Sequence, residues 1–137
     1  MRCAIGALGV WTLPAGLYLY VGSAWGAGGL AARVNRHLRG GAVRRWHIDY
    51  VRVWAQPVAV WLAPHEHCEC VWARHLVDAQ DACVIVPRFG ASDCRCPAHL
   101  LYFGARSLET IHVPGAHRQV RRQDYLTADY QTTMEET

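Results

Sequence analysis

Residues 18–24, with the sequence YLYVGSA, decide the fold of this chain. An apolar, aromatic segment of this kind predicts a β-strand, and Gly22 lets the backbone turn tightly or approach a phosphate because it lacks a Cβ. The glycine-rich residues 26–29 follow and open a predicted helix, on which Arg33 and His37 lie at i and i+4. A strand, a glycine bend and a helical guanidinium in this order are suited to hold a phosphodiester.

Length and composition predict one compact domain. A chain of 137 residues that is 52% hydrophobic can bury an ordinary core without obligatory metals or disulfides. A net charge of +3 is weak evidence for nucleic-acid binding. All 14 basic residues are Arg, and five of them lie in residues 33–45. The planar fork of Arg suits phosphate oxygens, but a genome biased toward arginine codons explains the missing lysines equally well.

The N-terminal residues resemble a signal peptide only superficially. Their glycines and Pro14 interrupt the apolar run, which is too broken to span a membrane as a helix. We expect instead a hairpin of two strands, residues 4–13 and 17–21, turned at residues 14–16. This predicts a cytoplasmic protein without membrane association, in which the six cysteines stay reduced.

The remaining chain predicts an α+β fold in which a small, mainly antiparallel sheet is flanked by helices. In the helix near residues 30–39, Leu30, Val34 and Leu38 form the apolar stripe. The other expected elements are strands at 46–54, 58–62, 83–86 and 100–103, a helix at 65–79 and a loop at 87–97. We expect a domain over residues 1–104 and a divergent C-terminal tail over 105–137, to which we assign no chemistry.

The order of these blocks resembles the GIY-YIG nuclease superfamily. Residues 20–22, Tyr-Val-Gly, stand in the place of Tyr-Ile-Gly, and Arg33 stands in the place of the helix arginine. The chain looks most like a small uncharacterised branch, found alone or fused to endonuclease III-like glycosylases. The similar blocks lie at residues 14–24, 28–38, 46–50 and 89–103. Family members generally begin with an additional strand bearing a Gly-Ile-Tyr half, so we expect either an upstream start or a domain shortened by that strand.

The resemblance implies a metal-dependent endonuclease acting on DNA, in DNA repair or processing. Such chemistry needs a divalent ion, a carboxylate to hold it, a base and a cation. By family position these roles fall to Glu69 as the ligand of Mg²⁺ or Mn²⁺, Arg33 at the phosphate, His37 beside the nucleophile and Tyr20 near the attacked phosphate. Glu69 lies one turn after Glu66, and both acids could simply favour a helix start through the macrodipole.

Further residues receive supporting roles. In the expected strand at 46–54, His47 and Asp49 share one face and either orient a ligand or form a structural pair. An arginine-lined surface would bind DNA through residues that approach or contact phosphates, namely Gly22, Arg36, Arg44 and Arg45.

Cysteines and histidines support a rival interpretation. Cys94, Cys96 and His99, together with Cys68 and Cys70, provide enough soft ligands for tetrahedral zinc. Neither C-x-C pair has the two-residue gap common in zinc knuckles, and a C-x-C pair within one helix directs its thiols to different sides. Three hypotheses therefore remain: an endonuclease, a catalytically impaired nucleic-acid-binding module, and a zinc-stabilised structural protein.

Overall fold

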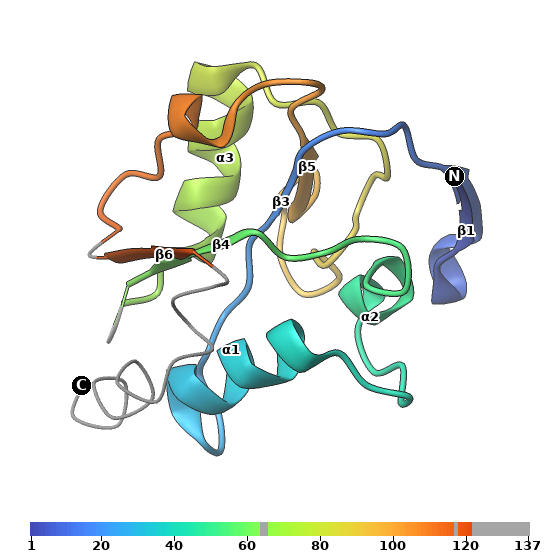
Figure 1. The fold of residues 1–137 in the computed structure, drawn as a ribbon, viewed down its shortest axis with the longest axis horizontal. Helices are drawn as coiled ribbons and strands as arrows, with labels where there is room; N and C mark the ends of the chain where they lie inside the picture. Colours follow the sequence, from blue (N-terminus) through green and yellow to red (C-terminus); the bar gives the residue numbers. More distant parts are fainter. Residues whose placement is uncertain (64–65, 117, 122–137) are drawn as a thin grey trace.

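The structure is a computed structural model that describes residues 1–63, 66–116 and 118–121 (Figure 1). Short strands and helices alternate along these residues, as expected for the α+β class. In chain order the elements are β1 (Arg2–Ala4), the 3₁₀ helix η1 (Gly6–Leu8), β2 (Val10–Thr12), β3 (Tyr18–Tyr20), α1 (Gly29–Arg39), α2 (His47–Val51), β4 (Ala59–Leu62), α3 (Glu69–Gln80), β5 (Leu100–Tyr102), the 3₁₀ helix η2 (Leu108–Thr110) and β6 (Arg118–Arg121).

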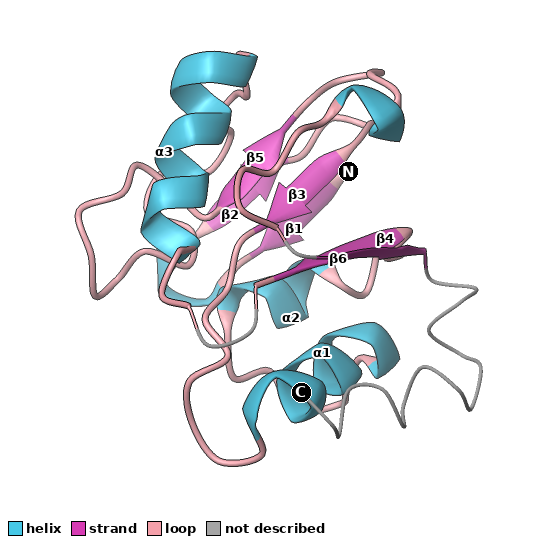
Figure 2. Cartoon of the chain, turned by 90° about the vertical axis from the view of Figure 1, so that its left-hand side faces the viewer, coloured by secondary structure: helices cyan, strands magenta, loops and turns pink. Residues whose placement is uncertain are grey.

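The strands form antiparallel pairs, which confirms the predicted fold class. Within the described residues the pairs are β1 with β2, β3 with β5, and β4 with β6. Figure 2 shows α3 beside the β3–β5 pair, with α2 and α1 below that pair. Strand β3 runs from the upper part of the molecule toward the two shorter helices, α1 and α2 (Figure 1).

Strand β3 is apolar throughout because both of its faces contact a hydrophobic cluster. Tyr18 and Tyr20 pack on the cluster that contains Ile5, Ile48 and Phe89. The alternate residues on either side of them, Leu17, Leu19 and Val21, pack on the cluster that contains Trp72, Leu76 and Leu101. Side chains alternate between the two faces of a strand, so the run that suggested a strand in the sequence separates the two main clusters of the core.

The predicted hairpin between residues 4–13 and 17–21 is wrong. β2 pairs with β1, with Thr12 opposite Arg2, whereas β3 pairs with β5, with Tyr18 opposite Tyr102. Gly16 directs the chain to this distant partner: it has φ +146°, and an added Cβ would lie 2.5 Å from the carbonyl oxygen of Gly104. The backbones meet there, and the Leu17 N–H donates to that carbonyl at 2.8 Å.

The predicted strand at 46–54 is also wrong, because residues 47–51 form α2. The Asp49 carboxylate accepts hydrogen bonds from the backbone N–H groups of Arg45 and Trp46 at 2.7 and 2.9 Å. These bonds satisfy donors at the start of the helix, as N-terminal capping requires. Ile48 and Val51 are buried at helical spacing. His47 and Asp49 consequently do not share a strand face.

Most other predicted elements are present with shifted ends. The helix near 30–39 is α1, the strands near 58–62 and 100–103 are β4 and β5, and residues 87–97 form a loop. Helix α3 begins at Glu69, and the start expected at His65 lies outside the described residues. The strand predicted at 83–86 is reduced to one bridge between Cys83 and Tyr102.

The segment after Phe103 contributes to the core. Ile111 and Val113 are buried against Trp72 and Leu76 of α3. The backbone of β6 pairs with β4, with Val120 opposite Val60. The later part of the expected tail, residues 122–137, lies outside the described residues.

Replacing Gly16 with Ala should destabilise the protein by about 2 kcal/mol or more, because the new Cβ would meet the Gly104 carbonyl and the Tyr102 ring. Gly41→Ala is the matched control, since nothing lies within 4 Å of its Cβ position. Denaturant unfolding measures both variants. Equal stability of the two would contradict the close approach of the backbones.

Candidate functional site

Tyr20 occupies the end of β3 and is held there by two glycines. An added Cβ at Gly22 would lie 3.1 Å from the Tyr20 ring, and one at Gly90 would lie 3.3 Å from it. The ring also contacts His37 edge-on, with the centroids 5.5 Å apart. Burial raises the pKa of Tyr20, so its hydroxyl remains a hydrogen-bond donor at neutral pH. Gly22 therefore makes room for Tyr20, in addition to any role at a phosphate.

The polar face of α1 surrounds the indole of Trp46, which immediately precedes α2. The guanidinium carbons of Arg33 and Arg36 lie 4.2 and 3.8 Å from the centroid of the Trp46 ring. The His37 ring lies 5.7 Å from the same ring. Leu30, Val34 and Leu38 face the other way and pack with Leu62 and Val60 of β4, so the predicted apolar stripe of this helix is confirmed.

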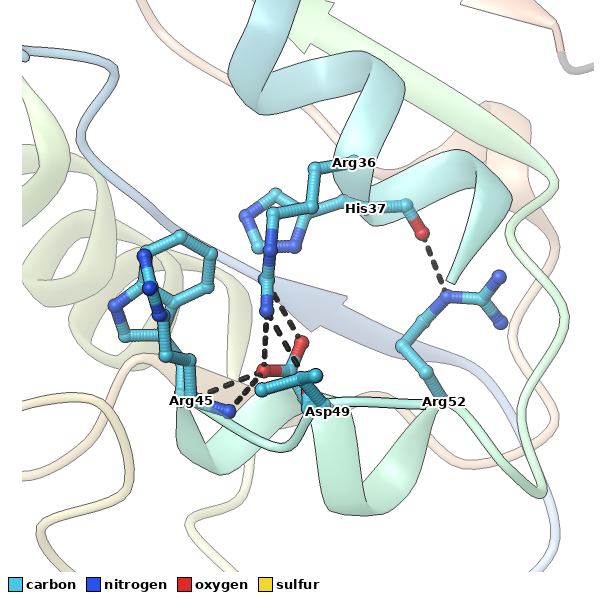
Figure 3. Close-up of polar contacts among 7 residues, drawn as sticks. Arg36, His37, Arg45, Asp49 and Arg52 are labelled. Atoms are coloured by element: carbon cyan, nitrogen blue, oxygen red, sulfur yellow. Dashed lines mark hydrogen bonds and ion pairs between the residues drawn. The ribbon is translucent and has the colours of Figure 1, made fainter. Parts of the chain in front are cut away.

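Asp49 and Arg52 connect α2 to α1 (Figure 3). The guanidinium of Arg36 donates to both Asp49 carboxylate oxygens, at 3.0 and 2.9 Å. Burial raises the pKa of Asp49, but the hydrogen bonds from Arg36, Trp46 and Arg45 outweigh burial and hold that pKa below its ordinary value. Arg52 donates to the backbone carbonyl of His37 at 2.8 Å. The two contacts fix the helix turn that carries His37.

His37 is neutral at physiological pH. Burial, together with the charges of Arg33 and Arg36, lowers its pKa from 6.5 to about 4. Its Nδ1 is buried and has no hydrogen-bond partner among the described residues. A neutral imidazole with an unpartnered nitrogen can accept a proton or a hydrogen bond from a ligand.

Arg33 differs from Arg36 in having no acidic partner within the described part of the chain. Its Nε donates to the Ser23 carbonyl at 2.8 Å, and its terminal nitrogens have no hydrogen-bond or ion-pair partner among the described residues. Arg33, His37 and Tyr20 all line a cavity of about 630 Å³, whose remaining walls are largely apolar. The structure thus brings together the three residues that the strand-and-helix motif indicated.

The other predicted DNA-binding and supporting residues are dispersed. Arg44 and Arg45 are exposed, with the Arg44 guanidinium 5.2 Å from the Tyr50 ring centroid. Arg36 is neutralised by Asp49. The Nδ1 of His47 accepts a hydrogen bond from the Gly90 N–H at 2.9 Å, so His47 and Asp49 act in separate networks.

Glu69 is the first residue of α3 and is half-buried. Its carboxylate has no hydrogen-bond or ion-pair partner among the described residues, and it lies close enough to His99 to raise the pKa of that imidazole against the larger effect of burial. Asp93 acts on His99 in the same way, and it also acts on Tyr20. This position makes Asp93 a second candidate carboxylate.

The segments before α1 and α3 touch each other. The ring of Trp25 stacks on that of His67, with 4.0 Å between the centroids and 5° between the planes. The loop that leads to Arg33 therefore contacts the residues that lead to Glu69.

A second group of polar side chains surrounds His99. The ligand atoms of Cys70, Cys94, Cys96 and His99 all lie within 4.8 Å of one another. Burial and the neighbouring thiols of Cys96 and Cys94 raise the pKa of Cys70 to about 12. A Cys₃His group of this kind can bind a metal ion and is typical of zinc sites. The oxygen ligands that Mg²⁺ prefers are absent from these four side chains.

A family model described as a domain of unknown function, DUF123, matches residues 1–122. The chain belongs to the DUF123 family. No curated protein and no solved structure matches the chain. The DUF123 match covers the three residues at the cavity, Glu69 and the whole Cys₃His group.

Within the described part of this DUF123 protein, no helix is both long enough and apolar enough to cross a membrane.

The depressed pKa of His37 predicts a pH-dependent stability. Between about pH 6.5 and pH 4 the unfolded chain gains a proton at His37 that the folded protein does not bind, so acidification favours unfolding. The free energy of unfolding should therefore fall more steeply over this window in the parent than in His37→Gln. Denaturant unfolding at pH 7, 5.5 and 4.5 measures the slope. His67→Gln, at an exposed position, should keep the parent's slope, and an unchanged slope in His37→Gln would contradict the assignment.

Proposed function

We propose that this protein is a metal-dependent endonuclease that hydrolyses phosphodiester bonds of DNA. The observation that carries the proposal is the convergence of Tyr20, Arg33 and His37 at one cavity, where the buried Nδ1 of His37 and the terminal nitrogens of Arg33 have no partner among the described residues. Buried polar atoms are usually hydrogen-bonded, so the Nδ1 of His37, which has no partner among the described residues, points to an external ligand, and the neighbouring Arg33 cation favours an anionic one. The resemblance of the motif to GIY-YIG nucleases supports the same conclusion.

Each of the three residues has a protonation state that suits this role. Arg33 is a cation without a counter-ion among the described residues, and it can stabilise the charge that develops on a phosphate. The Tyr20 hydroxyl is protonated and can donate to a phosphate oxygen. Neutral His37 can accept a hydrogen bond from the attacking water and orient it. A bound phosphate beside Arg33 would raise the pKa of His37, which would make the imidazole a better base when substrate is present.

In this proposal Glu69 would hold Mg²⁺ or Mn²⁺, although Glu69 is not among the residues that line the cavity of Tyr20, Arg33 and His37. Hard cations of this kind commonly bind through one or two carboxylates together with substrate phosphates. Glu69 and Asp93 each offer a carboxylate near His99, and neither carboxylate has a partner in the part of the chain that the structure describes. The bound ion would neutralise charge on the nonbridging oxygens.

A nucleic-acid-binding module without cleavage is the alternative. The charge of Arg33, which no acid in the described ranges pairs with, and the exposed Arg44 and Arg45 would serve binding even where no bond is hydrolysed. Cleavage and binding assays on the same protein separate the two functions.

Purified protein should nick plasmid or branched DNA in the presence of Mg²⁺ or Mn²⁺. Arg33→Gln and Glu69→Ala should each lower the nicking rate about 100-fold or more, because each removes a charge that acts on the phosphate. Arg39→Gln, at an exposed position of the same helix as Arg33, is the matched control. Undiminished nicking by Glu69→Ala would exclude that residue as the metal ligand, and DNA binding without nicking by the parent would favour the binding module.

DNA affinity should fall steeply with salt concentration, because each neutralised phosphate releases counter-ion. Replacing both Arg44 and Arg45 with Ala should flatten the plot of log affinity against log salt by about two units at most. The double variant of Arg2 and Arg74, which are also exposed, removes the same charge elsewhere and should keep the parent's slope. Absence of binding by the parent at low salt would contradict a DNA-binding function altogether.

A further inference from the structure

We propose that Cys70, Cys94, Cys96 and His99 bind one zinc ion in a closed, structural site. The proposal does not depend on nuclease activity, since it concerns a different set of side chains from Tyr20, Arg33 and His37. It assigns a metal of another chemical class from the Mg²⁺ or Mn²⁺ that Glu69 would hold.

The distances between the ligand atoms are close to those of a tetrahedral zinc site. With zinc–sulfur and zinc–nitrogen bonds of about 2.3 and 2.0–2.1 Å, neighbouring ligand atoms lie roughly 3.5–3.8 Å apart. The Nε2 of His99 lies 3.5 Å from the Cys94 sulfur and 3.9 Å from the Cys70 sulfur. All four ligand atoms lie within 4.8 Å of one another, so shortening the longest of these distances by about 1 Å would complete the coordination.

The burial of two of the four residues, Cys96 and His99, also favours a metal. Cys96 is fully buried and His99 is 5% exposed, and the thiols are the hydrogen-bond partners of the His99 Nε2 among the described residues. Thiol groups are weak donors and acceptors, so they satisfy a buried imidazole poorly. Zinc would bind the same atoms strongly and replace these weak contacts.

The fold holds the ligands in place from two segments. Cys70 lies in the first turn of α3, and the other three ligands lie in the loop that leads to β5. Arg88 braces this loop by donating to the backbone carbonyls of Cys96 and Cys94 at 2.9 and 2.7 Å. Support of this kind around the ligands is typical of a built metal site.

Four protein ligands leave no open position, which is the mark of a structural zinc site. Such a site would tie the N-terminal turn of α3, and with it Glu69, to the loop that carries Gly90. Loss of zinc should therefore loosen both segments and lower the thermal stability of the whole domain.

Metal analysis tests the proposal directly. Protein without an affinity tag, purified under reducing conditions and without chelator, should contain about one zinc ion per chain. Cys70→Ser and Cys94→Ser should lose most of this zinc. Cys68→Ser and Cys83→Ser are the matched controls and should keep it, because their thiols lie outside the group. No DNA is present in this assay, so its outcome is separate from that of the nuclease assay.

Cobalt substitution provides a measurement that does not depend on the folding of the variants. Co²⁺ added to metal-free parent protein should give the intense visible bands of a tetrahedral site and the near-ultraviolet charge-transfer bands of thiolate ligands. The weak spectrum of an octahedral site would overturn the proposal. So would a parent protein that stays free of zinc after incubation with Zn²⁺, a disulfide within the group in place of metal, or equal zinc content in the Cys70, Cys94 and control variants.

Discussion

The candidate site depends most on the four hydrogen bonds that the Asp49 carboxylate accepts. This carboxylate accepts two hydrogen bonds from Arg36 and two from the backbone N–H groups at the start of α2. Helices of 11 and 5 residues are too short to be stable by themselves, so their geometry depends on tertiary contacts. Asp49 caps one helix and binds the other, and it is 10% exposed, so that water competes little for its oxygens. The position of Trp46, and of the polar face of α1 around it, follows from this contact.

The same carboxylate determines how charge is distributed in the site. By neutralising Arg36 it leaves Arg33 as the cation beside Tyr20 and His37 that has no acidic partner among the described residues. It also raises the pKa of His37 slightly, but burial and the two arginines outweigh that effect and keep the imidazole neutral. A cation, a neutral acceptor and a phenolic donor therefore stand together without neutralising one another. An anion is the ligand that such a set complements best.

Patterns with a local cause could be predicted from the sequence, whereas those with a tertiary cause could not. The apolar stripe of α1 and the strand that ends at Tyr20 were predicted correctly because hydrophobic periodicity reflects their burial. Residues 46–54 alternate like a strand, but Asp49 caps the two N–H groups before a helix of five residues, which is too short for a periodic signal. The pairing of β3 with β5 depends on the approach of Gly16 to Gly104, 88 residues away in sequence, which no local pattern encodes.

The metal ligands show the same division, and they connect the two sites. The sequence supplied Cys94, Cys96 and His99 as candidates but not the choice between Cys68 and Cys70, which depends on where α3 begins.

The backbone carbonyl of His99 accepts a hydrogen bond at 2.8 Å from the N–H of Val21, the residue directly after Tyr20. Gly90 lies between the His99 side chain and the Tyr20 ring, and an added Cβ there would lie only 3.1 and 3.3 Å from them. The residue that would bind zinc, His99, and the residue that would contact a phosphate, Tyr20, are thus held together by the backbone hydrogen bond between Val21 and His99 and by the close contact at Gly90. A metal that fixes His99 would fix Tyr20 through these contacts. The position of the phenol would then depend on the zinc site, even though zinc would take no part in the chemistry.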